Sequence, residues 1–160
     1  MDRGNERERE VLERFRARCE AGAYAIDPDS IVHADAVPRE WIPLVDRSCP
    51  QLASSPDAWG RDIYDGSLVV LEVKCSYEAY MRRYRGPPPH YDAQLQARMA
   101  CEGGRVAMLI EGEWFANDRH EDGDVIGYDR AYDAITVAEI RAAARQQWEM
   151  VEELRRRMGT

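Results

Sequence analysis

Two charged residues stand in the most apolar stretch of the sequence. Residues 67–75 read SLVVLEVKC, and the charged members are Glu72 and Lys74. The abundance of valine and leucine is typical of a central strand. Side chains alternate between the two faces of a strand, so Glu72 and Lys74 point the same way, while Val73 points into the core on the other side. A carboxylate and an ammonium in such a strand need partners, because burying an unpaired charge is costly.

Two interpretations of this pair are open. A Glu–Lys ion pair on a solvated face of the sheet would be structural, and the spacing E-x-K often occurs by chance. In the catalytic interpretation Glu72 binds a hard divalent cation, and the carbonyl of Val73 contributes a further oxygen. Lys74 then orients or activates the attacking water. The strand taken alone favours the structural ion pair.

A second carboxylate shifts the balance towards catalysis. Asp57 follows a proline and precedes Glu72 by fifteen residues. We expect residues 51–60 and 67–75 to form a hairpin that brings both carboxylates to one cation. Mg²⁺ is typically held by one or two carboxylates with phosphate and water, which suits phosphodiester hydrolysis. Two other aspartates compete for this role but do not follow a proline at a bend: Asp62 and Asp65.

Two further motifs lie on expected helices. Apolar residues recur at helical spacing over residues 5–20, and Glu8 falls on that apolar face, four residues after Gly4. From this segment alone, an exposed glutamate in the first turn is the simpler interpretation. The second helix, predicted over residues 91–101, opens with Y-x-x-Q-x-Q and stops at a pair of glycines.

These motifs, in this order, resemble those of the lambda exonuclease and YqaJ viral recombinase family of the PD-(D/E)XK nuclease superfamily. The matching features are G-x-x-x-E at residues 4–8, S-P-D at 55–57, E-x-K-C at 72–75 and Y-x-x-Q-x-Q at 91–96. The run EWFAN that follows resembles the family's aromatic strand. The resemblance implies an α/β (α+β) fold with a restriction-endonuclease-like core, in which helices flank a central mixed sheet. We expect a single domain over residues 1–160.

The resemblance also assigns roles to individual residues. Asp57 and Glu72 would be the metal-binding carboxylates, with the carbonyl of Val73 beside them and Glu8 completing the site. Lys74 would be the catalytic lysine. Three more residues would support the site or contact DNA: Gln94 as a supporting glutamine, Ser55 at the terminal phosphate, and Tyr91 at the DNA.

The implied activity is a deoxyribonuclease that depends on Mg²⁺ or Mn²⁺. The resemblance favours a 5′→3′ exonuclease acting on duplex ends in phage-type recombination or repair. Its expected partners are DNA, further copies of the chain (related proteins form ring-shaped trimers) and a single-strand annealing protein. The sequence departs from the family pattern at three points. Ala58 and Ser76 stand where the family has glycine and proline, and the segment that helps to grip a 5′ phosphate is expected to be missing. These departures bear on the polarity and processivity of the expected exonuclease.

Two alternatives remain. A compact endonuclease or single-strand nuclease would keep the chemistry and change the substrate, and a non-catalytic binding protein would keep only the fold. The formal net charge of −8 argues against a general nucleic-acid coat, because phosphate contacts need lysine and arginine. It does not exclude a nuclease, since metal-binding carboxylates add negative charge.

The remaining composition indicates a cytoplasmic protein with no membrane partner. The charged N-terminus has no signal-peptide pattern, and no apolar run is long enough for a bilayer. The four scattered cysteines form no C-x-x-C pair, so no zinc site is predicted: Cys19, Cys49, Cys75 and Cys101. Buried free thiols are the favoured interpretation, and an iron–sulfur cluster that uses all four is the alternative.

Weaker patterns complete the expected elements. Strands are predicted over residues 30–33, 41–45, 105–111, 113–116 and 125–128, a short helix over 77–84, and loops over 85–89 and 117–124. A C-terminal helix is predicted over residues 136–158, with Thr136 as its N-cap. Its expected apolar face comprises Ile140, Ala144, Trp148, Val151 and Leu154. Arginines near this end could contact phosphate, or simply form a solvated helix face.

Overall fold

The structure is a computed structural model that describes residues 2–38, 44–76, 89–103, 106–113 and 125–158. The expected helix at 77–84 and the loop at 117–124 lie outside these ranges, as do parts of several expected strands. In chain order the elements are α1 (Asp2–Glu20), η1 (Pro28–Ser30), β1 (Val32–His33), η2 (Ala34–Ala36), β2 (Leu44–Asp46), β3 (Cys49–Ser54), β4 (Ala58–Arg61), β5 (Leu68–Ser76), α3 (Pro89–Glu102), β6 (Val106–Glu113), β7 (Val125–Ala131) and α4 (Ala134–Met158).

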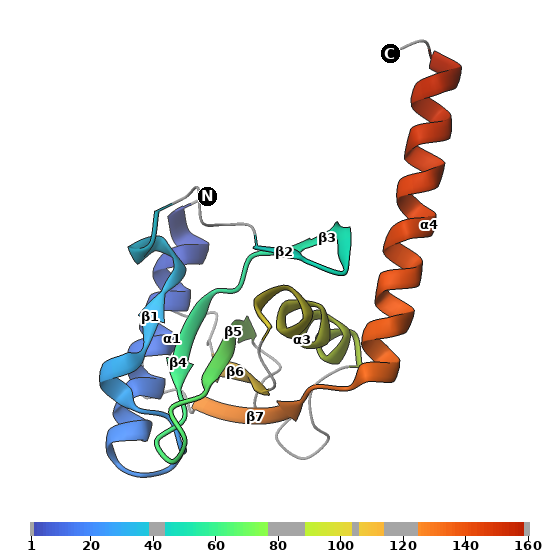
Figure 1. Cartoon of the computed structure of the whole chain (residues 1–160). Coiled ribbons are helices and arrows are strands. Elements are labelled where there is room, and N and C mark those ends of the chain that lie inside the picture. The colour runs from blue at the N-terminus through green and yellow to red at the C-terminus, as the bar shows by residue number, and fades with distance from the viewer. Residues whose placement is uncertain (1, 39–43, 77–88, 104–105, 114–124, 159–160) are drawn as a thin grey trace.

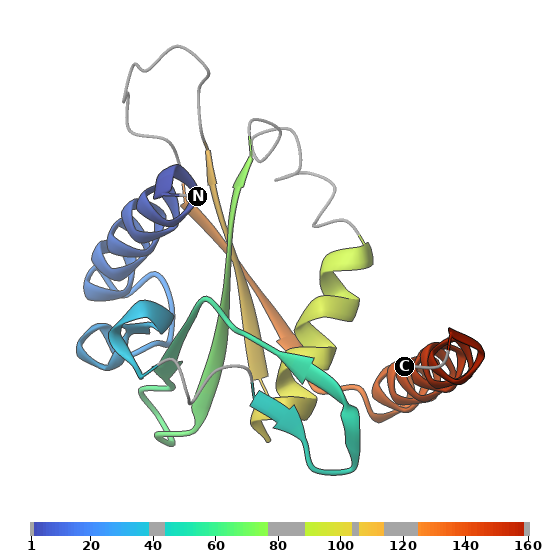
Figure 2. The same cartoon turned by 90° about the horizontal axis from the view of Figure 1, so that it is seen from above.

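The main sheet has five strands in the order β1-β4-β5-β6-β7, with β5 in the centre. Strands β5 and β6 are parallel, and the other neighbours are antiparallel. A parallel pair needs a crossover, and helix α3 lies within this one, between β5 and β6 in the chain. The sheet is mixed and flanked by helices, as the sequence predicts. Figure 2 shows α1 and α3 on opposite sides of it.

Strand β5 is buried on both faces, which explains its almost unbroken apolar sequence. On one face, Leu71 and Val73 pack in a core cluster with Leu12 and Phe15 of α1. On the other face Val70 packs in a smaller cluster with Leu95 and Met99 of α3. Alternation along the strand therefore places Glu72 and Lys74 on the side of α3, opposite the larger core, as predicted.

The expected strand over residues 51–60 is wrong as a single unit. Strand β3 ends at Ser54 and pairs with β2 in a separate two-stranded sheet, whereas β4 begins at Ala58 and pairs with β5. Pro56 lies in the interruption, and a proline has no N–H to donate to a ladder. The hairpin that carries the chemistry is therefore formed by β4 and β5, with a turn at residues 62–67.

Several boundaries also differ from the sequence prediction, among them those of α3, β6 and α4. Helix α3 begins at Pro89, which the prediction placed in a loop, since a first helical residue needs no N–H partner. Strand β6 continues through Gly112, which pairs with Val125. Helix α4 begins before Thr136: the carboxylate of Asp133 accepts the N–H of Ile135 over 2.9 Å and the Thr136 hydroxyl over 2.7 Å, so Asp133 is the cap.

The predicted apolar face of α4 is mostly uncovered. Of the described side chains of this helix, Val137 is the buried one, whereas Trp148 is 44% exposed and Leu154 is 55% exposed. Figure 1 shows why: the helix leaves the body after its first turns and projects away from it.

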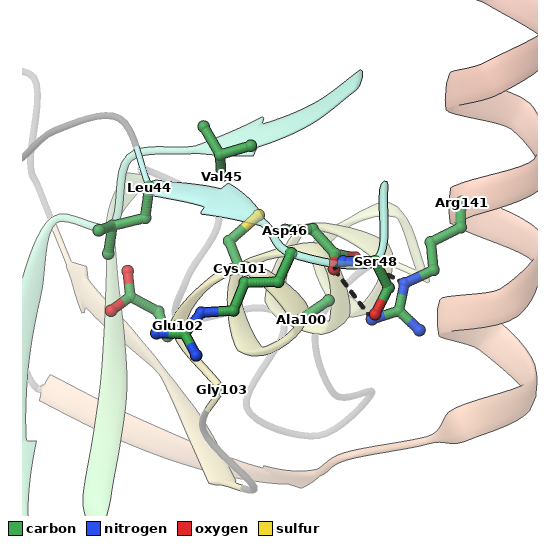
Figure 3. Close-up of a pocket in the computed structure, with 10 residues that line it drawn as sticks. Leu44, Val45, Asp46, Ser48, Ala100, Cys101, Glu102, Gly103 and Arg141 are labelled. Atoms are coloured by element: carbon green, nitrogen blue, oxygen red, sulfur yellow. Dashed lines mark hydrogen bonds and ion pairs between the residues drawn. The ribbon is translucent and has the colours of Figure 1, made fainter. Parts of the chain in front are cut away.

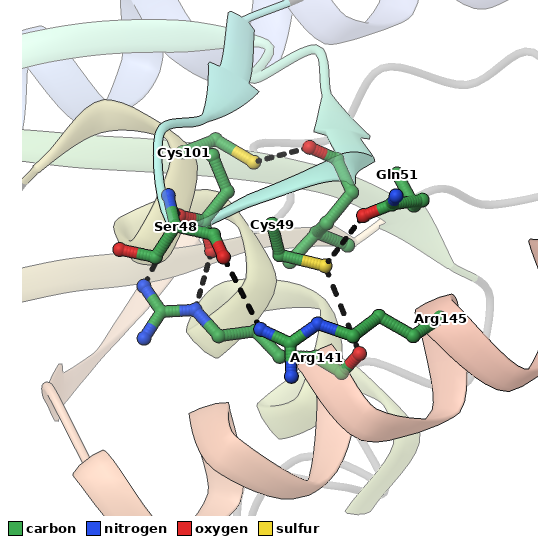
Figure 4. Close-up of polar contacts among 8 residues, drawn as sticks. Ser48, Cys49, Gln51, Cys101, Arg141 and Arg145 are labelled. Atoms are coloured by element: carbon green, nitrogen blue, oxygen red, sulfur yellow. Dashed lines mark hydrogen bonds and ion pairs between the residues drawn. The ribbon is translucent and has the colours of Figure 1, made fainter.

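The β2–β3 hairpin is fastened to the start of α4 by polar contacts (Figure 4). The guanidinium of Arg141 holds the buried carboxylate of Asp46, with Nε 2.5 Å from Oδ2 and Nη2 3.1 Å from Oδ1. Cys49 donates its thiol to the Arg141 carbonyl over 3.7 Å, and Arg145 donates to the Ser48 carbonyl over 3.2 Å. The Asp46–Arg141 pair is nearly withdrawn from water on the aspartate side, so this contact is structural.

All four cysteines are free, as predicted, but only Cys19 and Cys49 are buried, whereas Cys75 and Cys101 are half-buried. Burial raises the pKa of the thiols of Cys19, Cys75 and Cys101 to about 11, so these remain protonated at neutral pH. Among the described helices there is none long and apolar enough to cross a membrane.

Candidate active site

Asp57 is held at the end of the β4–β5 pair. Its Oδ2 accepts a hydrogen bond from the main-chain N–H of Val73 over 2.8 Å, and its own carbonyl accepts from the N–H of Ala34, also over 2.8 Å. Ala58, the next residue, pairs with Leu71 in the ladder. These hydrogen bonds hold Asp57 to β5 and to η2. Asp57 therefore lies beside the part of β5 that follows Leu71, as expected from the predicted hairpin.

Glu72 is fully buried, with 0% of its surface exposed. Its Oε1 accepts a charge-assisted hydrogen bond from the ammonium of Lys74. Burial raises the pKa of Glu72 to about 7, and the nearby charge of Asp57 adds to this effect. The positive charges of Arg98 and Lys74 oppose the rise. The site therefore holds two carboxylates that interact, together with two cations that partly compensate them.

Arg98 of α3 is the residue of this site that the sequence analysis missed. Its Nη2 lies 2.5 Å from Oε2 of Glu72, and its Nη1 lies 3.7 Å from Oδ1 of Asp57. Nη1 also donates to the main-chain carbonyl of Ser55. One signal was available: Arg98 follows Tyr91 by seven residues, two helical turns, so both fall on the same side of the helix.

Glu8 stands close to the site without joining a cluster of ligands. Burial raises its pKa, and next in size is the repulsion from Asp57, while Lys74 and Arg98 act in the opposite direction. The charge of Glu8 is therefore felt at the site. Nevertheless, the described residues include no group of three or more His, Cys, Asp or Glu side chains placed to hold one metal ion. Glu8 is best described as a neighbour of the Asp57–Glu72 pair.

The Y-x-x-Q-x-Q motif divides its residues between two tasks. The ammonium of Lys74 lies 5.8 Å from the centre of the Tyr91 ring, within cation–π range. Gln94 is exposed and lies on the same side of α3 as Tyr91 and Arg98. Gln96 is buried and structural: its amide donates to the Ala131 carbonyl and accepts the Asp133 N–H, each over 2.8 Å.

The remaining candidates are placed clearly. Ser55 is exposed, two residues before Asp57, and its carbonyl faces Arg98. Asp62 and Asp65 shape the β4–β5 turn: Asp62 accepts the N–H of Tyr64 over 2.7 Å, and Asp65 accepts the N–H of Ser67 over 2.8 Å. These two alternatives to Asp57 therefore stabilise the turn at the far end of the hairpin.

The donors present at the site fit a hard divalent cation. Oε2 of Glu72 is buried and has no hydrogen-bond partner among the described residues, although Arg98 is within ion-pair distance of it. The contact is close but not aligned as a hydrogen bond, which leaves a lone pair of a buried carboxylate available. Such an oxygen normally has a donor or a metal ion as its partner. With the carboxylate of Asp57 beside it, this gives two hard oxygen ligands of the kind that Mg²⁺ and Mn²⁺ prefer.

The structure also contains an open cavity of about 480 Å³, drawn in Figure 3. It lies between the β2–β3 hairpin, the C-terminal end of α3 and Arg141, and none of the predicted site residues lines it. The chemistry is instead gathered where β4, β5 and the middle of α3 meet. We place the candidate active site there, because two carboxylates, Asp57 and Glu72, and two cations, Lys74 and Arg98, converge at that point.

Comparison with solved structures agrees with this fold. No family model and no curated protein matches the chain. A crystal structure of LHK-Exo in complex with dAMP aligns over 96% of this chain and 73% of that chain, with 22% identity and a TM-score of 0.64. A second crystal structure, described as an alkaline exonuclease (LHK-Exo) from Laribacter hongkongensis, aligns over 91% and 68%, with 21% identity and a TM-score of 0.63. The chain therefore has the fold of this alkaline exonuclease, which confirms the predicted fold class.

Proposed function

We propose that the protein is a metal-dependent DNA nuclease. The observation that carries the proposal is the convergence of Asp57, Glu72 and Lys74, with a buried oxygen of Glu72 that has no hydrogen-bond partner among the described residues. A purely structural ion pair would need only Glu72 and Lys74. Burial raises the pKa of Glu72 and the additional carboxylate of Asp57 raises it further, so the arrangement costs stability. A cation between the carboxylates would relieve that cost. The fold shared with an alkaline exonuclease supports the same conclusion.

In this proposal Asp57 and Glu72 would hold Mg²⁺ or Mn²⁺, with the carbonyl of Val73 as a further oxygen and Glu8 nearby. The bound cation would supply a lowered pKa for water and compensation of the charge on phosphorus. Lys74 is anchored on Glu72 and would position the attacking water. The Val73 N–H fixes the carboxylate of Asp57, so that the ligand is in place before the substrate arrives.

The more specific proposal is a 5′→3′ exonuclease that acts on duplex ends in phage-type recombination or repair. It rests on the motif resemblance and on the position of Ser55, exposed and two residues from Asp57. A terminal phosphate bound at Ser55 would leave the first scissile bond near the carboxylates. This is how an exonuclease measures one nucleotide.

The test is incubation of the purified protein with end-labelled linear duplex and with closed circular DNA, each with and without Mg²⁺. Metal-dependent loss of the linear duplex, with intact circles, supports the exonuclease. Cleavage of both substrates supports the compact endonuclease. Absence of hydrolysis in Mg²⁺ and in Mn²⁺ refutes the nuclease and favours a protein that only binds DNA.

A further inference from the structure

One cation at the candidate site has no role in the function proposed above. The guanidinium of Arg98 is 14% exposed and lies between the two carboxylates, 2.5 Å from Glu72 and 3.7 Å from Asp57. Its hydrogen bond to the Ser55 carbonyl holds one side of the group. An arginine buried in this way must compensate charge, bind a ligand, or do both.

The contact with Glu72 is unusual for a buried ion pair. The distance is short, yet Oε2 of Glu72 has no aligned hydrogen-bond donor in the described part of the chain. The attraction is therefore electrostatic without the directional bond that normally accompanies it. Replacing this partner costs less than breaking an aligned, bidentate pair. A divalent cation that offers direct coordination can compete for the same oxygen.

The balance of charge at the site points in the same direction. The carboxylates of Glu8, Asp57 and Glu72 interact with the two cations Lys74 and Arg98, and Asp35 adds a further negative charge near Glu8. Negative charge therefore exceeds positive charge around the site even with Arg98 in place, so a divalent cation can be added without expelling Arg98. Arg98 thus need only leave the carboxylates, and it can remain at the site.

The backbone of helix α3 can stay in place while Arg98 changes its partner. Leu95 and Met99, one turn before Arg98 and directly after it, are fully buried against the sheet and fix the helix backbone. The guanidinium can therefore change partner by rotating its side chain, without movement of the helix. A planar guanidinium fits two phosphate oxygens as well as it fits a carboxylate.

We propose that Arg98 is the resident counter-cation of the Asp57–Glu72 pair and binds the DNA phosphate once a divalent cation has taken its place on the carboxylates. This inference rests on the proposed nuclease function and deepens it. Arg98 thus competes with the metal ion for the carboxylates but helps to bind the DNA. Removing Arg98 should therefore strengthen metal binding and weaken DNA binding.

The first measurement is Mn²⁺ binding without DNA, followed by the electron paramagnetic resonance signal of the free ion. We expect Arg98→Gln to bind Mn²⁺ about tenfold more tightly than the unaltered protein, because a competing positive charge is gone. Arg98→Lys keeps the charge and should stay within about threefold of the unaltered protein. An unchanged or weaker Mn²⁺ affinity in a folded Arg98→Gln protein overturns the proposal.

The second measurement is the affinity for a fluorescent 5′-phosphorylated duplex in saturating Ca²⁺, with the DNA checked for integrity after each titration. We expect Arg98→Gln to bind about tenfold more weakly, and its slope of log affinity against log salt to fall by about 0.9, the change for one lost phosphate contact. A merely structural residue would weaken both metal and DNA binding. DNA binding equal to that of the unaltered protein overturns the phosphate role, and with it the proposal.

Arg61→Gln is the matched control. Arg61 also donates to a main-chain carbonyl, that of Gly66 over 3.0 Å, but it lies at the turn end of the β4–β5 hairpin. Both affinities should be unchanged in this variant. The result is separable from the nuclease proposal: a protein that hydrolyses no DNA refutes the nuclease, whereas the Mn²⁺ titration still decides whether Arg98 competes with the cation.

Discussion

The main-chain N–H of Val73 donates to the carboxylate of Asp57 over 2.8 Å, at the point where the ladder between β4 and β5 ends. The Asp57 carboxylate thus accepts the hydrogen bond that a main-chain carbonyl of a neighbouring strand would otherwise accept. Asp57 cannot turn away from β5 without leaving the Val73 N–H unsatisfied, which is costly in a buried strand. The neighbouring side chain on that strand is Glu72. The two carboxylates are therefore kept together although they lie fifteen positions apart in the sequence.

The first prediction concerns hydrolysis. Glu72→Gln and Lys74→Ala should each lower DNA hydrolysis by roughly 100-fold or more, because in the proposed function they remove a metal ligand and the group that positions water. Both proteins should remain folded, as judged by circular dichroism and thermal unfolding. Activity at the unaltered level in either variant rejects the assigned site. Unfolding of both variants favours the structural ion pair instead.

The second prediction concerns pH and the metal-free protein. The pKa of Glu72 is raised from 4.5 to about 7 by burial and by Asp57, so the folded state binds a proton that the unfolded chain has already lost. The free energy of unfolding should therefore fall as pH rises from 4.5 to about 7, and then level off. Urea unfolding in EDTA at several pH values measures this.

The matched comparison for that experiment is Glu72→Gln, which removes the titrating group. Its stability should depend less on pH over the same window. Added Mg²⁺ should stabilise the unaltered protein above pH 7, where Glu72 is ionised, and should not stabilise the variant to the same extent. Equal pH profiles for the two proteins would show that Glu72 does not carry the effect.

The pairing of Asp57 with Glu72 could be predicted because it depends on local signals. Proline before Asp57, alternation along β5 and a turn between them define one short hairpin. The split of residues 51–60 into β3 and β4 could not be predicted in the same way. A strand pattern shows which side chains share a face, but it does not show that the partner strand changes at Pro56.

Arg98 and α4 show two further limits of sequence reasoning. A single arginine within a helix matches no motif, and its importance appears only when α3 is packed beside β5. The apolar stripe of α4, which includes Trp148 and Leu154, indicates which side of the helix could be buried. Periodicity cannot reveal that the body of the protein ends after the first turns, which leaves these residues exposed.

The third prediction concerns the hairpin contact with α4. Arg141→Gln should lower the free energy of unfolding by about 2–3 kcal/mol, since it leaves the buried carboxylate of Asp46 with the Ser48 N–H but without a positive charge to pair with. Arg145→Gln is the control, because Arg145 is exposed and makes a longer contact with the Ser48 carbonyl; it should cost less than about 0.5 kcal/mol. Equal destabilisation in urea would show that the Asp46–Arg141 pair is not a main support of the hairpin.

The fourth prediction concerns recognition of DNA ends. Ser55 is exposed, it precedes Asp57 by two residues, and its carbonyl is held by Arg98, so its position relative to the carboxylates is fixed. A hydroxyl there can donate to a terminal phosphate, and a hydrogen bond to a charged group contributes about 1.5–3 kcal/mol. Ser55→Ala should therefore reduce the preference for 5′-phosphorylated over 5′-hydroxyl duplex ends by roughly tenfold. Its rate on 5′-hydroxyl ends should not change.

The control for end recognition is Ser67→Ala, at the far turn of the β4–β5 hairpin. The main-chain N–H of Ser67 donates to Asp65 over 2.8 Å, and the substitution keeps this hydrogen bond. This variant should keep the full preference for phosphorylated ends, measured from initial rates on end-labelled duplexes. If Ser55→Ala also keeps it, the terminal phosphate is bound elsewhere. If closed circles are cleaved as fast as linear DNA, the protein does not require an end at all. The exonuclease proposal would then be lost, while the proposed hydrolysis by Asp57, Glu72 and Lys74 would still stand, because the proposal assigns those residues to the phosphodiester and not to the end.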